Sequence, residues 1–160
     1  MGTPELVIMH NTTPGSGAWM GRVAVFLGKI CTEDPNAETT GEELVEHLIE
    51  AFDLPFEQSR YLLLAGVNEI AVLGTCVARI DIGYENRRNC FVGFLNLKRG
   101  HDWRRVFARG HKEVEKFARL HGCAEIRVHV MSQSHARLYR QRKYGGFEPV
   151  QLVLSRRIDA

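Results

Sequence analysis

A basic, glycine-containing stretch in the middle of the chain has the composition of an anion-binding turn. The sequence LNLKRGHDWRRVFARG, residues 95–110, leads from an apolar segment through a Lys-Arg-Gly triplet into a helical pattern. Open backbone N–H groups and the positive end of the helix dipole bind anions where a glycine allows close approach. Arg104 and Arg105 add positive charge at the helix start. These features predict a phosphate-binding turn, with an ordinary basic helix start as the alternative.

The other side chains that could perform chemistry form no second pattern. The four cysteines, Cys31, Cys76, Cys90 and Cys123, lie far apart with no CxxC pair, and each stands among apolar neighbours. That usage is typical of reduced, buried thiols in an intracellular protein. No compact pair of ligands indicates a metal site, and no Ser-His-Asp or Cys-His arrangement has supporting spacing. The sequence therefore predicts neither a bound metal nor a catalytic triad.

Length and composition indicate a single folded domain over residues 1–160. The chain is 44% hydrophobic and 25% charged, which is the composition of a globular protein with a buried core. No basic leader precedes an apolar run, and no window approaches the roughly 18 apolar residues of a membrane span. We therefore expect a cytoplasmic protein that makes no membrane contact.

The net charge of +2 is distributed unevenly along the chain. Residues 1–97 contain 6 basic and 13 acidic residues, whereas residues 98–160 contain 15 basic and 6 acidic ones. The second part can therefore attract anionic ligands. Basic helical faces are usually solvated surfaces, and no stacking-aromatic motif accompanies these, so we do not expect nucleic-acid binding.

Hydrophobic periodicity predicts the elements that must position the basic turn. Apolar runs bounded by turn residues predict strands, and apolar residues every three or four positions predict helices. Three consecutive strands with short connections indicate an antiparallel meander. The helix after the basic turn has Asp102 as its expected N-cap and Gly122 as its expected C-cap. The predicted strands cover residues 5–10, 60–67, 70–84, 90–97, 124–131 and 147–158, and the predicted helices lie around residues 19–30, 40–54, 103–122 and 132–146.

The order of these elements predicts an α/β (α+β) fold in which a mixed central sheet carries helices on both faces. The order is strand, helix, helix, three strands, helix, strand, helix, strand. It resembles the GNAT superfamily of N-acyltransferases over nearly the whole chain. The pairs Gly122-Cys123, before the fifth strand, and Gly146-Phe147, before the last, carry the resemblance together with FVGFLNL at residues 91–97. In finer pattern the chain is similar to small GNAT-like proteins encoded by bacteriophages, whose turn is also irregular.

The resemblance implies that acetyl-coenzyme A is the co-substrate and that the basic turn holds its pyrophosphate. It also implies that the strand edge before the turn pairs with the pantetheine arm. The family motif has a second glycine or alanine after Gly100, but Asp102 and Trp103 intrude here. An acidic side chain beside a pyrophosphate is unfavourable unless it turns away. The coenzyme-binding residues implied by the resemblance are Leu95, Asn96, Leu97, Lys98, Arg99, Gly100, Arg104, Arg105 and Ser132.

A tyrosine in the helix after the fifth strand often protonates the leaving thiolate in this family. Tyr139 occupies that position here, and Ser132 stands where the family has an asparagine. About three extra residues precede Gly146, so Tyr144 is the alternative acid. No residue is identified as the general base, for which the candidates are Glu69, Asp81, Glu85 and His129.

Two functions therefore follow from the resemblance. The first is an acetyl-CoA-dependent N-acyltransferase acting on an amine of a small molecule or a protein. The second is a catalytically inactive GNAT-fold phage protein that binds a host or virion partner, working in the host cytoplasm or the virion. The retained Arg99-Gly100 pair and Tyr139 favour the enzyme, whereas the altered glycine motif and Ser132 favour the binding protein.

Overall fold

The computed structural model describes residues 3–33, 41–83, 86–128, 137, 139–141 and 147. The chain divides into two compact units, Met1–His129 and Val130–Ala160. The first unit contains every helix and strand described below. The predicted last helix and last strand lie largely outside the described residues, although Arg137, Tyr139 and Arg140 have helical conformation.

A five-stranded sheet in the order β1-β2-β3-β4-β5 forms the centre of the first unit. The first four strands pair antiparallel, and β5 joins β4 in parallel. The predicted meander is thus confirmed, because each of its strands is an apolar run that short connections return against the previous one. The strands are β1 (Glu5–Ile8), β2 (Tyr61–Val67), β3 (Val72–Ile82), β4 (Arg88–Leu97) and β5 (Glu125–Val128).

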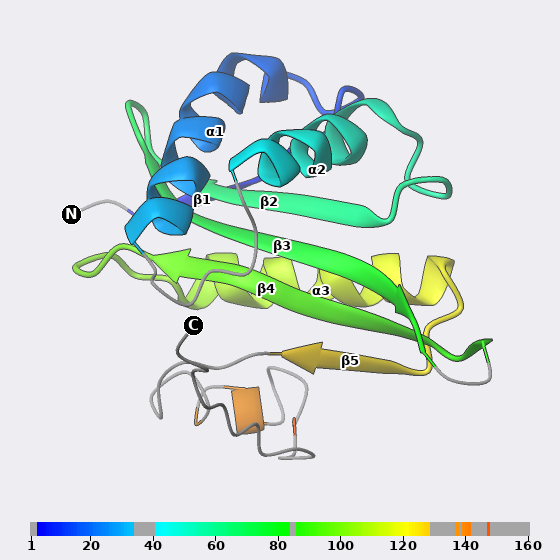
Figure 1. Cartoon of the computed structure of the whole chain (residues 1–160). Helices are drawn as coiled ribbons and strands as arrows, with labels where there is room; N and C mark the ends of the chain where they lie inside the picture. Colours follow the sequence, from blue (N-terminus) through cyan, green and yellow to red (C-terminus); the bar gives the residue numbers. More distant parts are fainter. Residues whose placement is uncertain are drawn as a thin grey trace, which may run out of the picture. The chain divides into compact units, whose positions relative to one another are not determined.

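Helices cover both faces of this sheet, as Figure 1 shows, with α1 (Ser16–Glu33) and α2 (Gly41–Asp53) on one face and α3 (Arg104–Leu120) on the other. Each face has its own core. The first packs Val23 and Leu27 of α1 and Leu48 of α2 against β2 and β3. The second packs Val114 and Phe117 of α3 against residues of β2 to β5. Burial of these apolar stripes is the main force that holds the helices on the sheet.

The ends of α3 combine one confirmed and one wrong prediction. Gly122 follows the C-cap residue His121 and has φ +66°. The N–H of Gly122 donates to Arg119 O at 3.1 Å, and the N–H of Cys123 donates to Ala118 O at 2.9 Å. These two bonds form a Schellman motif, in which a glycine tolerates the left-handed backbone.

The N-cap of α3 is Trp103 rather than Asp102, and Trp103 makes no side-chain capping bond. Asp102 lies one residue earlier, where its Oδ1 accepts the N–H of Arg104 at 3.2 Å. The carboxylate therefore still satisfies a helix N–H, but from outside the helix. The expected N-cap was wrong by one residue, because α3 begins at Arg104 and Trp103 directly precedes it.

No helix of the described part of the chain is both long and apolar enough to cross a membrane.

Candidate functional site

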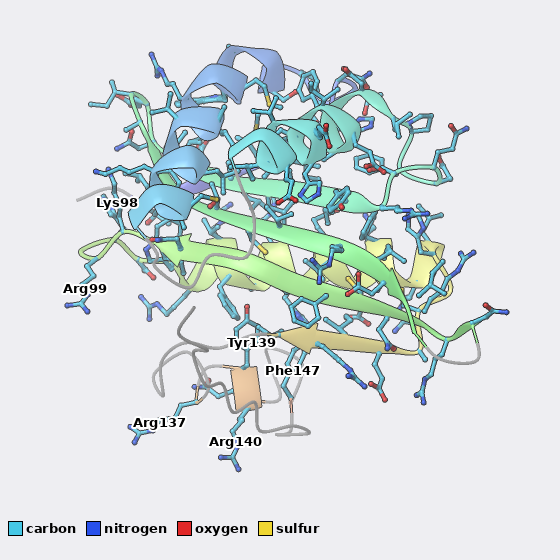
Figure 2. All side chains as sticks on the ribbon, viewed as in Figure 1. Lys98, Arg99, Arg137, Tyr139, Arg140 and Phe147 are labelled. Carbon is cyan, nitrogen blue, oxygen red and sulfur yellow. The ribbon has the colours of Figure 1, made fainter. Side chains whose placement is uncertain are left out.

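The turn between β4 and α3 is held at its start by the sheet. The N–H of Lys98 donates to Leu73 O at 2.8 Å, so the first residue of the turn is tied to β3. Gly100 then adopts φ +88°, a left-handed conformation that a side chain would strain. Lys98 and Arg99 are exposed, and Figure 2 shows them on this turn, with Arg99 extending away from the sheet. The backbone conformation of the turn therefore favours glycine at position 100.

The backbone N–H groups of this turn are largely open. In the part of the chain that the structure describes, those of Arg99, Gly100, Arg105 and Val106 donate to no acceptor. The first regular bond of α3 runs from Phe107 N to Trp103 O at 2.8 Å. Several donors therefore lie close together at the positive end of a helix dipole, an arrangement suited to an anion. We call residues 98–106 the turn cradle.

Asp102 occupies a further N–H group of the turn cradle, that of Arg104, and carries a negative charge beside the open ones. Its carboxylate accepts from the backbone N–H of Arg104 and receives Nε and Nη2 of the same residue at 3.0 and 2.8 Å. These hydrogen bonds lower the pKa of Asp102 to about 2, so the carboxylate remains ionised at neutral pH. Both side chains are exposed. Arg104 therefore neutralises Asp102, and Arg99 and Arg105 are left as the cations next to the open amides.

Trp103 does not block the turn cradle, because its ring packs down onto the sheet. Gly66 of β2 and Gly74 of β3 are direct cross-strand partners, and together they leave a notch without side chains. A Cβ on Gly66 would lie 2.9 Å from Cη2 of Trp103, and a Cβ on Gly74 would lie 2.8 Å from the same atom. The indole Nε1 donates to Lys98 O at 2.9 Å. The indole thus joins the beginning of the turn to the beginning of α3.

The predicted strand edge lies directly before the turn. Asn96 and Leu97 of β4 pair with Thr75 and Gly74 of β3 on one side. On the other side, β5 pairs with β4 only over Asn89–Val92. Within the described residues, the last part of β4, which includes Leu95, has no strand partner on the β5 side. The side chain of Leu95 is outside the described part, although its backbone belongs to β4.

The predicted acid belongs to the second unit of the chain. The Tyr139 side chain is 7% exposed and contacts Phe147 edge-on, with ring centroids 5.2 Å apart. Tyr139 O also accepts the N–H of Phe147 at 2.9 Å. Figure 2 shows the two rings together. Ser132 and Tyr144 lie outside the described residues.

The structure singles out none of the four candidate general bases. Asp81 pairs with Arg79, whose Nε lies 3.0 Å from the carboxylate. Glu69 is exposed in the turn after β2, and both Glu85 and His129 are outside the described residues. In the described ranges, no three His, Cys, Asp or Glu side chains are grouped to hold a metal ion.

Sequence reasoning missed the notch that accepts Trp103. Gly66 and Gly74 each stand inside a predicted strand, where a glycine often marks the close approach of another group. That signal was present, but the group that approaches comes from about thirty residues further along the chain. Only the strand register shows that the two glycines are opposite each other.

Comparison with known proteins supports the architecture. No protein-family model and no curated protein sequence matches the chain. Among solved structures, glucosamine-6-phosphate N-acetyltransferase from Arabidopsis thaliana has a TM-score of 0.63 at 12% identity, covering 99% of this chain and 100% of its own. Aminoglycoside 6′-N-acetyltransferase AAC(6′)-Ih from Acinetobacter baumannii has a TM-score of 0.61 at 14% identity, covering 98% and 99%.

A third similar structure contains a coenzyme-derived ligand. It is AAC(6′)-Iy in complex with a bisubstrate analog, CoA-S-monomethyl-acetylneamine, with a TM-score of 0.63 at 12% identity, covering 98% of this chain and 99% of its own. At such low identity the likeness establishes the fold alone, and the activity must be argued from the residues of this chain. The chain has the α+β fold of the GNAT N-acetyltransferases.

Proposed function

We propose that the protein is an acetyl-CoA-dependent N-acyltransferase that acts on a primary amine. The observation that carries this proposal is the group of open N–H donors in the turn cradle, beside a glycine with φ +88°. Pyrophosphate oxygens are acceptors only, so they complement such donors. Arg99 and Arg105 supply the positive charge that a pyrophosphate requires.

The strand edge before the cradle supports a defined path for the rest of the coenzyme. The pantetheine arm contains amide groups, and unpaired backbone groups of β4 near Leu95 and Leu97 can pair with them as an added strand does. Such pairing fixes the thioester relative to the sheet and lowers the entropic barrier to attack by the amine. Bound acetyl-CoA supplies the activated acetyl group.

Tyr139 remains the proposed donor of a proton to the leaving thiolate. A Tyr139→Phe variant keeps the ring that packs on Phe147 and removes only the hydroxyl. We expect its kcat to fall about a hundredfold, the usual size of a general-acid contribution, with the Kd for acetyl-CoA unchanged. Tyr144→Phe is the matched control. If Tyr144→Phe loses the activity instead, the proton donor is reassigned to Tyr144.

The acceptor is proposed to be an amino sugar or a related small amine. The similar solved structures include enzymes named for glucosamine-6-phosphate and for aminoglycosides, and these compounds are the first to test. We further infer that the protein works in the cytoplasm, where acetyl-CoA is present.

Titration calorimetry with acetyl-CoA tests the proposal directly. We expect micromolar binding by the parent protein and at least tenfold weaker binding by Gly100→Ala, because a Cβ strains the left-handed residue and redirects the neighbouring N–H groups. Gly122→Ala imposes the same kind of strain at the other end of α3 and should bind normally. Absence of binding heat in the parent protein would contradict the coenzyme site.

One observation favours a second function, in which the fold binds a host or virion partner without catalysis. The Asp102 carboxylate occupies the N–H of Arg104 and places a negative charge in the turn cradle. The second function replaces the first if acetyl-CoA binds but none of the amino sugars or aminoglycosides tested is acetylated, by either the parent protein or Tyr139→Phe.

A further inference from the structure

The outer edge of β1 presents unpaired backbone groups. In the described sheet β1 is an end strand, and β2 is its only strand partner there. The N–H of Met9 donates to β2 at 2.9 Å, which places Val7 in the phase that also bonds to β2. The backbone groups of Leu6 and Ile8 therefore point away from β2. Among the described residues, only the carbonyl of Ile8 has another partner, the N–H of His10 at 3.0 Å.

A hollow of about 280 Å³ lies between this strand and the first turns of α3. Its volume is just below the range of about 300 to 1,000 Å³ for whole-ligand pockets, so it suits a side chain better than a complete small molecule. Leu6 of β1 and Val106 of α3 give it apolar surface, and Arg105 and Arg109 line it from α3. The open edge of β1 therefore has a side-chain pocket next to it.

Arg109 gives the hollow a cation without a partner. Its side chain is exposed and forms no ion pair or hydrogen bond in the described part of the chain. Arg105 precedes it by one helical turn, so the two side chains lie along the same side of α3. Arg104 and Arg119 of the same helix, by contrast, pair with carboxylates. The hollow is therefore suited to a carboxylate from outside the described residues.

The carboxylate of Glu5 belongs to the other face of the sheet, although Glu5 also borders the hollow. Leu6 packs in the core beneath α3, whereas Val7 packs in the core beneath α1 and α2. Because side chains alternate along a strand, Glu5 shares the face of Val7. A second copy of the chain that paired its own β1 with this edge would therefore offer Arg109 no Glu5 carboxylate. The charges favour a different chain as the occupant.

We propose that the edge of β1 binds an extended acidic segment of another protein, which adds a strand to the sheet and places a glutamate or aspartate side chain in the hollow. Backbone hydrogen bonds to Leu6 and Ile8 hold the segment, and the contact of its carboxylate with Arg109 selects for acidic sequence. Arg105 adds positive charge beside it. The site requires no coenzyme, so the inference goes beyond the proposed function.

The test is an NMR titration of the full chain with a short capped peptide in which glutamate alternates with valine. The peptide should bind with a Kd below about 1 mM and slow solvent exchange of the Leu6 and Ile8 amides at least about tenfold. Arg109→Gln should weaken binding about fivefold, the upper value for an exposed ion pair. The matched control Lys112→Gln removes the same charge from the same helix outside the hollow and should bind normally.

Modified peptides separate strand addition from general charge attraction. A version with glutamine in place of glutamate should bind at least about tenfold more weakly, because it loses the charge-assisted bonds. In an added strand of either direction, only alternate N–H groups of the peptide face β1. Two versions that are N-methylated on the glutamates or on the valines keep the same charge. One of them should lose binding, and the other should keep it.

Several outcomes overturn the proposal. It is wrong if the peptide does not bind at about 1 mM, if Lys112→Gln weakens binding as much as Arg109→Gln, or if both N-methylated peptides bind equally. Protection of Leu6 and Ile8 that rises with protein concentration in the absence of peptide would assign the edge to a second copy instead. Arg109→Gln should bind acetyl-CoA as the parent protein does. Failure of the peptide site therefore leaves the proposed function standing, and failure of the coenzyme site leaves the peptide site standing.

Discussion

The notch that accepts Trp103 gives a prediction whose size follows from the geometry. In Gly66→Ala the three atoms nearest to the new Cβ all belong to the ring of Trp103. The ring cannot move easily, because its Nε1 is bonded to Lys98 O and its far edge lies against Gly74. The substitution must therefore displace the indole or shift β2. In Trp103→Ala these three atoms are gone, and the obstruction with them.

Overpacking of this kind costs about 1 to 3 kcal/mol, and losing the indole hydrogen bond adds about 1 kcal/mol. We therefore expect Gly66→Ala to lower the free energy of unfolding by about 3 kcal/mol in the parent protein. In the Trp103→Ala background the cost should be near zero. The coupling energy between the two substitutions is then about 2 to 3 kcal/mol, at the upper end for residues in contact.

Gly74→Ala is the internal control for this cycle. Its Cβ would lie 2.8 Å from Asn96 O, a backbone atom that cannot turn away, as well as 2.8 Å from Trp103 Cη2. Its cost should therefore persist in Trp103→Ala. Urea unfolding of the single and double variants measures each change in the free energy of unfolding. The dependence of that free energy on urea concentration should be the same in every variant. An equal cost of Gly66→Ala in both backgrounds would refute the placement of the indole in the notch.

Three further predictions concern the cradle, the core and the end of α3. Asp102→Asn should tighten acetyl-CoA binding a few-fold at low salt, measured by calorimetry, because the substitution removes a negative charge from the turn cradle. In the parent protein, Asp102 should cause no change in acetyl-CoA affinity between about pH 4 and 8, since its pKa of about 2 keeps the carboxylate ionised over that range. Burial raises the pKa of Cys90 to about 12, so at about pH 8 its thiolate should be about a thousandfold rarer than in the unfolded chain; mass spectrometry after alkylation should find Cys90 modified only once urea unfolds the protein, and rapid native labelling would disprove its burial. Gly122→Ala should lower the free energy of unfolding by about 1 kcal/mol, because only glycine adopts φ +66° without strain; an unchanged urea midpoint would contradict the Schellman motif.

The order of elements through β5 could be predicted from sequence because each pattern is local. The three central strands are apolar runs separated by short turns, and α3 has an apolar stripe that Gly122 ends. Composition also indicated a basic turn that contains Gly100 between β4 and α3. These features depend on residues within a few positions of each other, which a single sequence displays directly.

The orientation of Asp102 and Trp103 could not be predicted, because it depends on the sheet. Both residues interrupt the expected glycine motif, and sequence alone could not show which way they turn. The notch of Gly66 and Gly74 exists only after β2 and β3 pair in register, and it then accepts the indole.

The bond between the indole of Trp103 and Lys98 O gives the protein a built-in fluorophore at the site. Trp19 is the only other tryptophan in the sequence, and it packs against the opposite core. A Trp19→Phe protein would therefore emit only from the residue that links the start of the turn to α3. Its emission maximum and quenching would follow the occupancy of the turn in solution, without a label.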